Sequence, residues 1–221
     1  MTQRRAVDVA AGVLVRPDGR ILMGSRPAGK PYAGYWEFPG GKFEPGESAG
    51  EALERELREE LGLTVKESFP WFSRVLDYPH ARVKLYFRRC WHWDGEPRSL
   101  EHQQFGFFTL ADIPGELLPL DGMIAGWTGL PDTAEGMPRE AACGTICAQV
   151  TGQRTGLVYR GGFASCAEDL ERLAGQGADF ALGVSGDKGL LADNPLPVYC
   201  PRSCGLSLAQ VRRQGWQGLW D

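Results

Sequence analysis

Three glutamates, Glu56, Glu59 and Glu60, have spacings that would bring their carboxylates together on a helix. Residues three and four positions apart share one helical face. Residues 44–60 contain seven acidic and two basic side chains, and this local charge of −5 would be penalised by like-charge repulsion unless cations bind there. Mg²⁺ prefers oxygen ligands and is commonly held by a few carboxylates together with substrate phosphates. The pattern therefore predicts a phosphate site that works through Mg²⁺, with Mn²⁺ as an alternative.

A solvated, glutamate-rich helix is the alternative explanation, in which Arg55 and Arg58 only supply ion pairs. The flanking sequence argues against it. A Gly40-Gly41 turn precedes the acidic stretch, Glu47 follows that turn, and Gly62 ends the stretch. We therefore favour the phosphate site, and we expect Arg55 to orient the carboxylates through bidentate ion pairs, including one with Glu47.

The helix that carries the glutamates is predicted from Ser48 to Leu61. Its apolar residues, at positions 49, 52, 53, 57 and 61, recur at steps of three and four. Ser48 is a suitable N-cap and Gly62 a suitable terminator. This segment has the strongest helical pattern in the chain.

Alternating apolar residues and turn residues predict strands on both sides of this helix. The first two strands should form a hairpin around the turn at residues 16–19. A short apolar helix is predicted near the end of the first half of the chain. The predicted strands are residues 7–15, 20–23, 71–78, 83–93 and 105–110, and the short helix is residues 121–127.

Nine positions spread over 23 residues match the signature of one enzyme family. The signature is a glycine, five residues, a glutamate, seven residues, and then Arg-Glu-apolar-any-Glu-Glu-any-Gly-apolar. The matching residues are Gly41, Glu47, Arg55, Glu56, Leu57, Glu59, Glu60, Gly62 and Leu63. On these residues the chain resembles the Nudix hydrolases of the MutT type, over about residues 9–131.

The resemblance implies a Nudix α/β/α sandwich with a mixed β-sheet and a pyrophosphohydrolase activity. The products would be a nucleoside monophosphate and pyrophosphate. The box glutamates matching Glu56, Glu59 and Glu60, with the backbone carbonyl matching Gly40, would bind the metal. The base that activates water would be either a box glutamate or Glu101.

The substrate implied by the resemblance is a nucleoside triphosphate, with 8-oxo-dGTP as the first candidate. Arg26 and Lys42 match positive positions near the phosphates, and Phe38 and Tyr78 could stack on the base. Asp121 stands where the MutT segment ends in an asparagine that reads the oxidised purine.

Because Asp121 replaces that asparagine, the sequence leaves open which base is recognised. A carboxylate can accept a hydrogen bond from the protonated N7 of 8-oxoguanine, but it cannot donate to O6 unless it is itself protonated. The relatives' arginine in the Tyr-Pro-His turn is also replaced here, by Ala81. The alternatives are another diphosphate substrate, such as a nucleotide sugar or a thiamine-pathway diphosphate, or a nucleotide sensor without turnover.

A domain boundary is predicted near residue 130, which gives a Nudix domain at 1–130 and a second module at 131–221. The second module shows two strand-helix-strand patterns, typical of parallel βαβ units. Residues 164–221 resemble the late strands of a thiamine phosphate synthase or TenI-like barrel. The module is too short for a complete barrel of about 250 residues. We therefore expect a truncated, partial TIM-barrel-like α/β module.

Six cysteines include two Cys-x-x-x-Cys pairs, Cys143 with Cys147 and Cys200 with Cys204. The second pair has some likeness to a zinc knuckle, but the spacing is loose and we favour buried free thiols for both pairs.

The composition is that of an ordinary globular protein, with 43% hydrophobic and 24% charged residues. A net charge of −4 gives no general attraction to nucleic acid or to an anionic membrane. No apolar run approaches the length needed to cross a bilayer, so we expect a cytoplasmic protein whose partner is a small nucleotide. The sequence does not distinguish a monomer from a dimer.

Overall fold

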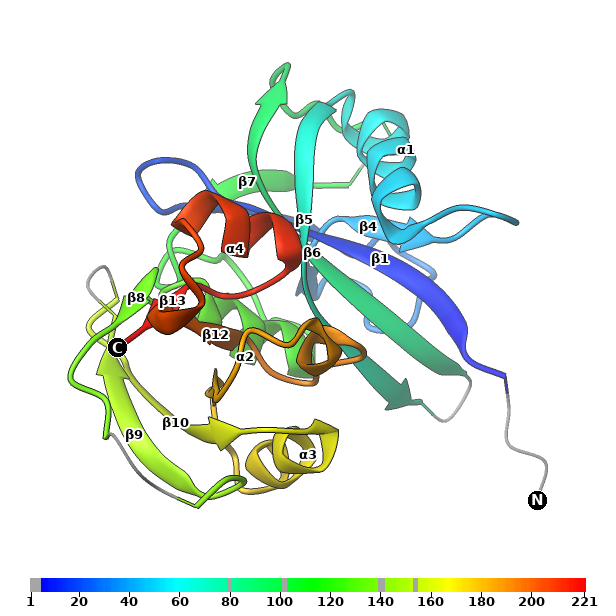
Figure 1. Cartoon of the computed structure of the whole chain (residues 1–221). Coiled ribbons are helices and arrows are strands. Elements are labelled where there is room, and N and C mark those ends of the chain that lie inside the picture. The colour runs from blue at the N-terminus through cyan, green and yellow to red at the C-terminus, as the bar shows by residue number, and fades with distance from the viewer. Residues whose placement is uncertain (1–4, 79–80, 101–102, 139–141, 153–154) are drawn as a thin grey trace. The chain divides into compact units, whose positions relative to one another are not determined.

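The structure is a computed structural model that describes residues 5–78, 81–100, 103–138, 142–152 and 155–221 (Figure 1). The chain divides into two compact units. Unit 1 comprises Met1–Ser68 and Val75–Thr128, and unit 2 comprises Phe69–Arg74 and Gly129–Asp221. The predicted mixed α/β fold is confirmed. No helix in the described ranges is long and apolar enough to cross a membrane.

The first sheet of unit 1 contains parallel and antiparallel neighbours. Strand β1 lies parallel to β6, with Val7 opposite Val83 and Leu14 opposite Cys90, and antiparallel to β4. The strand order is β4-β1-β6-β5. The bounds are β1 Val7–Leu14, β4 Gly40–Lys42, β5 Thr64–Asp77 and β6 Arg82–Asp94.

The second sheet of unit 1 is antiparallel, in the order β3-β2-β7, with β2 at Ile21–Ser25, β3 at Trp36–Glu37 and β7 at Phe105–Phe108. The turn predicted at residues 16–19 is present, and one bridge joins Val15 to Ile21. The predicted hairpin is wrong beyond that bridge, because β1 and β2 then pair with different partners in different sheets. The backbone N–H and C=O groups of each strand form their hydrogen bonds with those partners instead of with each other.

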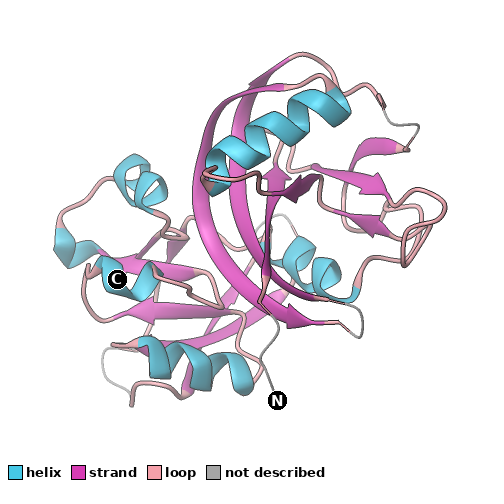
Figure 2. Cartoon of the chain, turned by 90° about the vertical axis from the view of Figure 1, so that its right-hand side faces the viewer, coloured by secondary structure: helices cyan, strands magenta, loops and turns pink. Residues whose placement is uncertain are grey.

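Helix α1, Ala49–Leu61, packs on β1 and β4 and is seen in Figure 2 beside the strands of the first sheet. Ser48 and Glu51 form a capping box, and Gly62 ends the helix in the left-handed conformation with φ 66°. The predicted helix and both of its ends are confirmed. Helix α2, Pro119–Trp127, also confirms its prediction. The apolar face of α1 belongs to a core formed by Ala10, Leu14, Leu22, Ala52, Leu53, Leu57, Leu61, Leu63, Val65 and Cys90.

Unit 2 is built on a sheet with the strand order β8-β13-β12-β11-β10-β9. The predicted parallel pairing is confirmed between β10 and β11, β11 and β12, and β12 and β13. Strand β9, antiparallel to β10, was not predicted. The strands are β8 Thr133–Ala134, β9 Ile146–Thr151, β10 Val158–Ala164, β11 Phe180–Gly183, β12 Val198–Pro201 and β13 Leu219–Trp220. The helical segments are α3 Ala167–Gly175, η1 Lys188–Leu191, η2 Arg202–Cys204 and α4 Leu208–Gln214.

The middle of β5 groups with unit 2 through buried hydrogen bonds. Trp71 Nε1 donates to Gln217 Oε1 at 2.8 Å, and Asn194 Nδ2 donates to the Trp71 carbonyl at 3.1 Å. The Ser73 amide donates to the Asn194 carbonyl at 3.0 Å. Unit 2 therefore includes a segment from the first half of the sequence, which the predicted boundary near residue 130 did not include.

Candidate active site

Two glycines fix how closely the backbone approaches the acidic helix. Gly40 has φ +148°, and a Cβ built on it would lie 2.1 Å from the Ala10 carbonyl oxygen. A Cβ on Gly41 would lie 2.2 Å from the carboxylate carbon of Glu56. Any side chain at Gly41 would thus displace the Glu56 carboxylate, which lies against the backbone of β4. The glycine pair positions the carboxylate.

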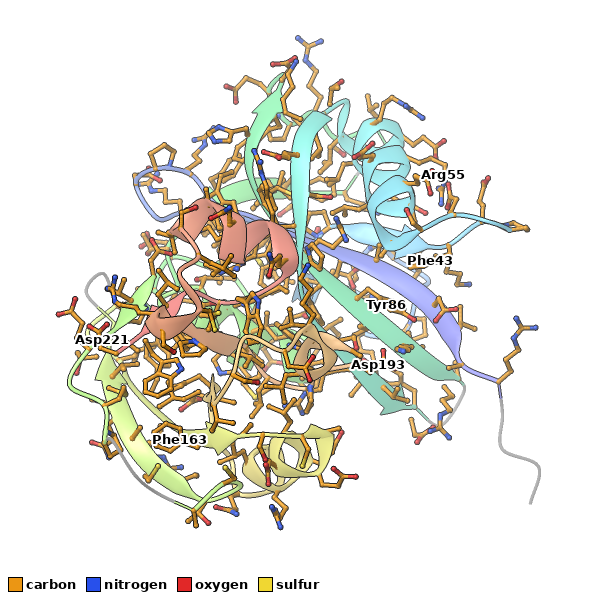
Figure 3. All side chains as sticks on the ribbon, in the orientation of Figure 1. Phe43, Arg55, Tyr86, Phe163, Asp193 and Asp221 are labelled. Carbon is orange, nitrogen blue, oxygen red and sulfur yellow. The ribbon has the colours of Figure 1, made fainter. Side chains whose placement is uncertain are left out.

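Arg55 links the carboxylates of this region, and Figure 3 labels it on α1, on the side of the loop that leads into the helix. Its Nε and Nη2 donate to the two oxygens of Glu47 at 2.8 and 2.9 Å. Its Nη1 donates to Glu56 Oε1 at 2.9 Å and to Glu59 Oε2 at 3.3 Å. Nη2 also donates to the Lys42 carbonyl at 2.8 Å. The expected bidentate contact with Glu47 is therefore present, while the catalytic role of these residues stays a prediction.

The Arg55 contacts hold Glu47 ionised. The hydrogen bonds from the Arg55 side chain, followed by the one from the Glu44 amide, lower the pKa of Glu47 to about 2. The hydrogen bonds to Glu47 and then to Glu56 raise the pKa of Arg55 above its ordinary value. At neutral pH the cluster contains a permanent cation and more than one carboxylate, so it retains negative charge.

The box glutamates differ in exposure. The Glu56 side chain is 17% exposed, whereas that of Glu59 is 56% exposed. The backbone carbonyl of Glu60 accepts from the Leu100 amide at 3.0 Å, which fixes the start of the following loop. Glu101 lies outside the described residues. Glu59 is thus more accessible than Glu56, the other box glutamate that contacts Arg55.

The chemistry of the donors fits a hard divalent cation. Glu56, Glu59 and Glu60 supply only carboxylate oxygens, and Gly40 supplies a carbonyl oxygen. Across the described ranges, however, no three His, Cys, Asp or Glu side chains converge as a ready metal site. Glu56 and Glu59 are instead drawn to Arg55. The metal-ligand set therefore stays a prediction.

A second polar cluster surrounds Asp121, which is 6% exposed near the start of α2. Burial raises the pKa of Asp121 well above its ordinary range, and the nearby Glu37 adds to this shift. Arg26 and a hydrogen bond with the Phe38 backbone act in the opposite direction. Burial also raises the pKa of Glu37, which pairs with Arg26. Asp121 is thus a carboxyl group whose surroundings favour the neutral form.

The remaining predicted substrate residues fall into different environments. Burial, followed by the charge of Asp121, raises the pKa of Tyr78, so Tyr78 and Asp121 are close. The Phe38 side chain is 5% exposed and packs edge-on against Phe87, at 6.1 Å between ring centroids. That position is in the core, which leaves its backbone as the part near Asp121. Lys42 is exposed. Arg26 Nε donates to the Pro31 carbonyl at 2.8 Å.

Sequence reasoning missed Glu37. It lies between the buried aromatic residues Trp36 and Phe38, at 5% exposure each, and contributes a second carboxyl group beside Asp121. A charged residue between two aromatic residues was the signal that could have identified it. Its proximity to Asp121 depends on tertiary structure, since the two residues are far apart in the chain.

Comparisons with known proteins agree with this geometry. A family model described as the NUDIX domain matches residues 5–127. The 8-oxo-dGTP diphosphatase of Haemophilus influenzae is 34% identical over 106 residues, which cover 48% of this chain and 77% of that protein. The CTP pyrophosphohydrolase of Escherichia coli is 54% identical over 104 residues, which cover 45% and 73%. A crystal structure of a MutT NUDIX hydrolase from Burkholderia pseudomallei, 27% identical, aligns with a TM-score of 0.51 over 56% of this chain and 98% of that one. This chain belongs to the Nudix family and is a Nudix hydrolase.

Proposed function

We propose that the protein is a Mg²⁺-dependent nucleoside triphosphate pyrophosphohydrolase whose main substrate is 8-oxo-dGTP. The products would be 8-oxo-dGMP and pyrophosphate, and the role would be removal of a mutagenic nucleotide from the pool. The observation that carries the reaction class is the Arg55-linked group of Glu47, Glu56 and Glu59 beside Gly40 and Gly41 of strand β4.

The protein's own residues would position the reactants. Glu56, Glu59 and Glu60, with the Gly40 carbonyl, would hold the cation. When bound, Mg²⁺ supplies Lewis-acid stabilisation of the charge that develops on the phosphate oxygens. The planar Arg55 guanidinium holds the Glu56 carboxylate beside Gly41 by a hydrogen bond from Nη1. Its Nη2 donates to Glu47, which fixes the orientation of the guanidinium. Such bracing limits the motion of a ligand side chain and so pre-organises the site.

A box glutamate or Glu101 removes the proton from the attacking water. The two assignments differ in their consequence for the pH dependence. Replacing the true base with glutamine removes the rise of kcat on the acidic side of the pH profile, whereas replacing a ligand lowers kcat at all pH values and raises the metal requirement. Glu101→Gln and Glu60→Gln, measured side by side over pH 5–9 at saturating Mg²⁺, distinguish the two.

Asp121 supports recognition of the oxidised base. 8-Oxoguanine carries a proton on N7 and an acceptor at O6, so a partner that both accepts and donates satisfies both. A neutral carboxylic acid does this and a carboxylate does not. Because burial raises the pKa of Asp121, the neutral form extends to higher pH. An aspartate here can therefore replace the family's asparagine.

CTP is a second candidate, favoured by the 54% identity to a protein named CTP pyrophosphohydrolase. Cytosine offers an acceptor at N3 beside the donor N4 amino group. A neutral Asp121 matches this edge as well as it matches 8-oxoguanine. The two substrates therefore use the same residue, and a direct competition measures which one is preferred.

The test is steady-state hydrolysis of 8-oxo-dGTP, dGTP, CTP, a nucleotide sugar and thiamine diphosphate with Mg²⁺. Glu59→Gln is compared with Glu54→Gln, which makes the same charge change at an exposed position of α1 outside the cluster. We expect the wild type to hydrolyse 8-oxo-dGTP with a much higher kcat/KM than the other substrates. Glu59→Gln should abolish this preferred hydrolysis, and Glu54→Gln should retain it. Preference for CTP would move the assignment to the second candidate. Nucleotide binding without metal-dependent turnover would make the protein a sensor.

A pH series tests the role of Asp121. The neutral acid is lost as pH rises through its raised pKa, so kcat/KM for 8-oxo-dGTP should fall on the alkaline side. Asp121→Asn, whose amide donates and accepts at every pH, should remove that fall. An identical alkaline limb in both proteins would contradict the neutral-acid assignment.

A further inference from the structure

Two thiols in unit 2 lie in contact where β12 ends. Cys200 is the third residue of β12 and is fully buried, at 0% exposure. Cys204 ends the short helix η2 and is exposed. The Cys204 thiol interacts with the Cys200 thiol through a side-chain hydrogen bond. One sulfur of the pair is therefore accessible to solvent and the other is held behind it.

The loop after β11 lies beside both sulfurs. A Cβ built on Gly186, in the loop after β11, would lie 2.6 Å from Cys204 Sγ and 4.0 Å from Cys200 Sγ. The missing side chain at position 186 thus leaves the room in which the two sulfurs meet. This observation is independent of the hydrogen bond between the thiols, and it places both sulfurs within 4.0 Å of the same point.

We propose that Cys200 and Cys204 are a modification site at which a hydroperoxide forms a reversible intramolecular disulfide. The peroxide first oxidises the Cys204 thiolate to a sulfenic acid, and its O–O bond breaks to release an alcohol or water. The Cys200 sulfur then attacks the sulfenic sulfur, and the hydroxyl leaves as water with the Cys200 proton. In total, two thiols and one hydroperoxide give one disulfide, one alcohol or water, and one water.

The order of the two steps follows from the environments of the thiols. Burial, followed by the charge of Cys204, raises the pKa of Cys200 to about 12, which makes Cys200 a poor first nucleophile. Cys204 is exposed and is the sulfur that a peroxide can reach. Cys200 is already in contact with it, so the second step is intramolecular and fast.

A disulfide accounts for this pair better than zinc does. Structural zinc sites use four ligands, commonly cysteine and histidine. In the part of the chain that the structure describes, no third or fourth such ligand joins these two sulfurs. The zinc alternative is therefore not supported by the geometry, whereas two adjacent thiols are what a disulfide requires.

The other pair provides an internal comparison. Cys143 and Cys147 have the same sequence spacing, but Cys147 is the second residue of strand β9 and Cys143 precedes the turn residue Gly144, which has φ +74°. Both of these thiols are at least partly exposed, so peroxide can reach them. If spacing and access alone decided the reaction, the two pairs would oxidise equally.

Peptide mapping of the full chain separates the two pairs. Trypsin cleaves after Lys188, Arg202 and Arg212, so a Cys200–Cys204 bond joins the peptides 189–202 and 203–212 into one product. A bond between Cys143 and Cys147 instead appears as a loss of two hydrogens within the peptide 140–154. The protein is treated with a small excess of hydrogen peroxide, and free thiols are alkylated before digestion. We expect the joined peptides to form at least about tenfold faster than the modified 140–154 peptide and to separate on treatment with dithiothreitol.

Two variants test the cause. Cys204→Ser changes an exposed residue and should abolish the joined peptides. Gly186→Ala retains both thiols but puts a methyl group where the sulfurs meet, and it should slow the joining by about tenfold. Far-ultraviolet circular dichroism and a thermal melt of each variant check that unit 2 is folded. Sulfinic acid at Cys204 without joined peptides, or equal rates for the two cysteine pairs, would overturn the proposal.

Discussion

An arginine meets carboxylates on a helix in both units, and the two arrangements differ in what they leave over. On α1, Arg55 is 14% exposed and contacts Glu47, Glu56 and Glu59. On α3, Arg172 is 60% exposed and pairs with Asp169, which is 3% exposed. One buried cation is shared among several carboxylates in the first case. One buried carboxylate is supplied with donors in the second.

The difference separates the candidate active site on α1 from a structural contact on α3. The Ser165 amide at 2.8 Å and the Ser165 hydroxyl at 2.7 Å both donate to Asp169 Oδ2, and Arg172 donates to Oδ1, so both carboxylate oxygens have a partner within this segment. The Arg55 group retains surplus negative charge and an exposed carboxylate, Glu59. Surplus negative charge that the fold does not neutralise is what a bound cation can use. Satisfied charge contributes to stability alone.

Removing the shared cation should have the largest effect. Arg55→Ala frees Glu56 and Glu59 from their brace and leaves Glu47 without its bidentate partner, so we expect kcat/KM to fall about 100-fold. Arg55→Lys should restore little, because an ammonium cannot bond Glu47 through two parallel donors. The measurement is kcat/KM for the preferred nucleotide over a Mg²⁺ titration, with the melting temperature as control. Full activity in Arg55→Lys would show that charge alone matters.

Displacing one carboxylate should have the second-largest effect on activity. Gly41→Ala puts a methyl group 2.2 Å from the Glu56 carboxylate carbon, so the carboxylate must move. We expect about a 10-fold loss of kcat/KM and a higher Mg²⁺ requirement. Gly46→Ala, in the loop that follows β4, is a control at which a Cβ meets no atom within 4 Å, although φ +91° makes it strained. Equal losses in both would attribute the effect to the loop backbone rather than to Glu56.

Asp169→Asn should lower stability and leave catalysis unchanged. Burial opposes ionisation of Asp169, but the hydrogen bonds from Ser165 and Arg172 outweigh it and lower the pKa to about 2. A group with a depressed folded pKa stabilises the protein above its unfolded pKa, near 3.8, and that contribution is lost as pH falls toward 2. We expect a loss of about 1–3 kcal/mol at neutral pH, measured by urea unfolding.

The variant should also lose part of the acid dependence. Between pH 5 and pH 2.5, the difference in unfolding free energy between wild type and Asp169→Asn should shrink. Hydrogen exchange of the α3 amides localises the change to this helix. A difference that stays constant over that range, or a fall in kcat, would contradict the assignment of Asp169 to a structural cap.

Local pattern predicted α1 and its ends because the signals are local. Ser48, Glu51 and Gly62 act on neighbouring backbone groups, and the apolar spacing defines one face. The contact of Arg55 with Glu47 spans one turn and the start of a helix, so fixed offsets were enough to predict it. The parallel pairing in unit 2 followed from the alternation of strands and helices.

The parts that sequence did not predict depend on tertiary contacts. The split of β1 and β2 into two sheets is decided by partners elsewhere in the chain, such as β6 and β7. The approach of Glu37 to Asp121 and the grouping of residues 69–74 with unit 2 have no local signal. The two cysteine pairs share one spacing, and only the fold distinguishes them.

The smallest effect should come from removing the other arginine. Arg172 is mostly exposed, so its ion pair is screened by solvent and is worth about 0–1 kcal/mol. Arg172→Ala removes the donor to Asp169 Oδ1 but leaves both Ser165 donors on Oδ2. We expect the free energy of unfolding in urea to fall by less than about 1 kcal/mol and kcat/KM to be unchanged. The contrast with Arg55→Ala is the sharpest form of the comparison: the same residue type, on a helix and beside carboxylates, matters for activity only where the negative charge exceeds what the fold neutralises. A loss of stability in Arg172→Ala as large as that in Asp169→Asn would mean that the arginine, and not the two Ser165 donors, keeps the buried carboxylate ionised.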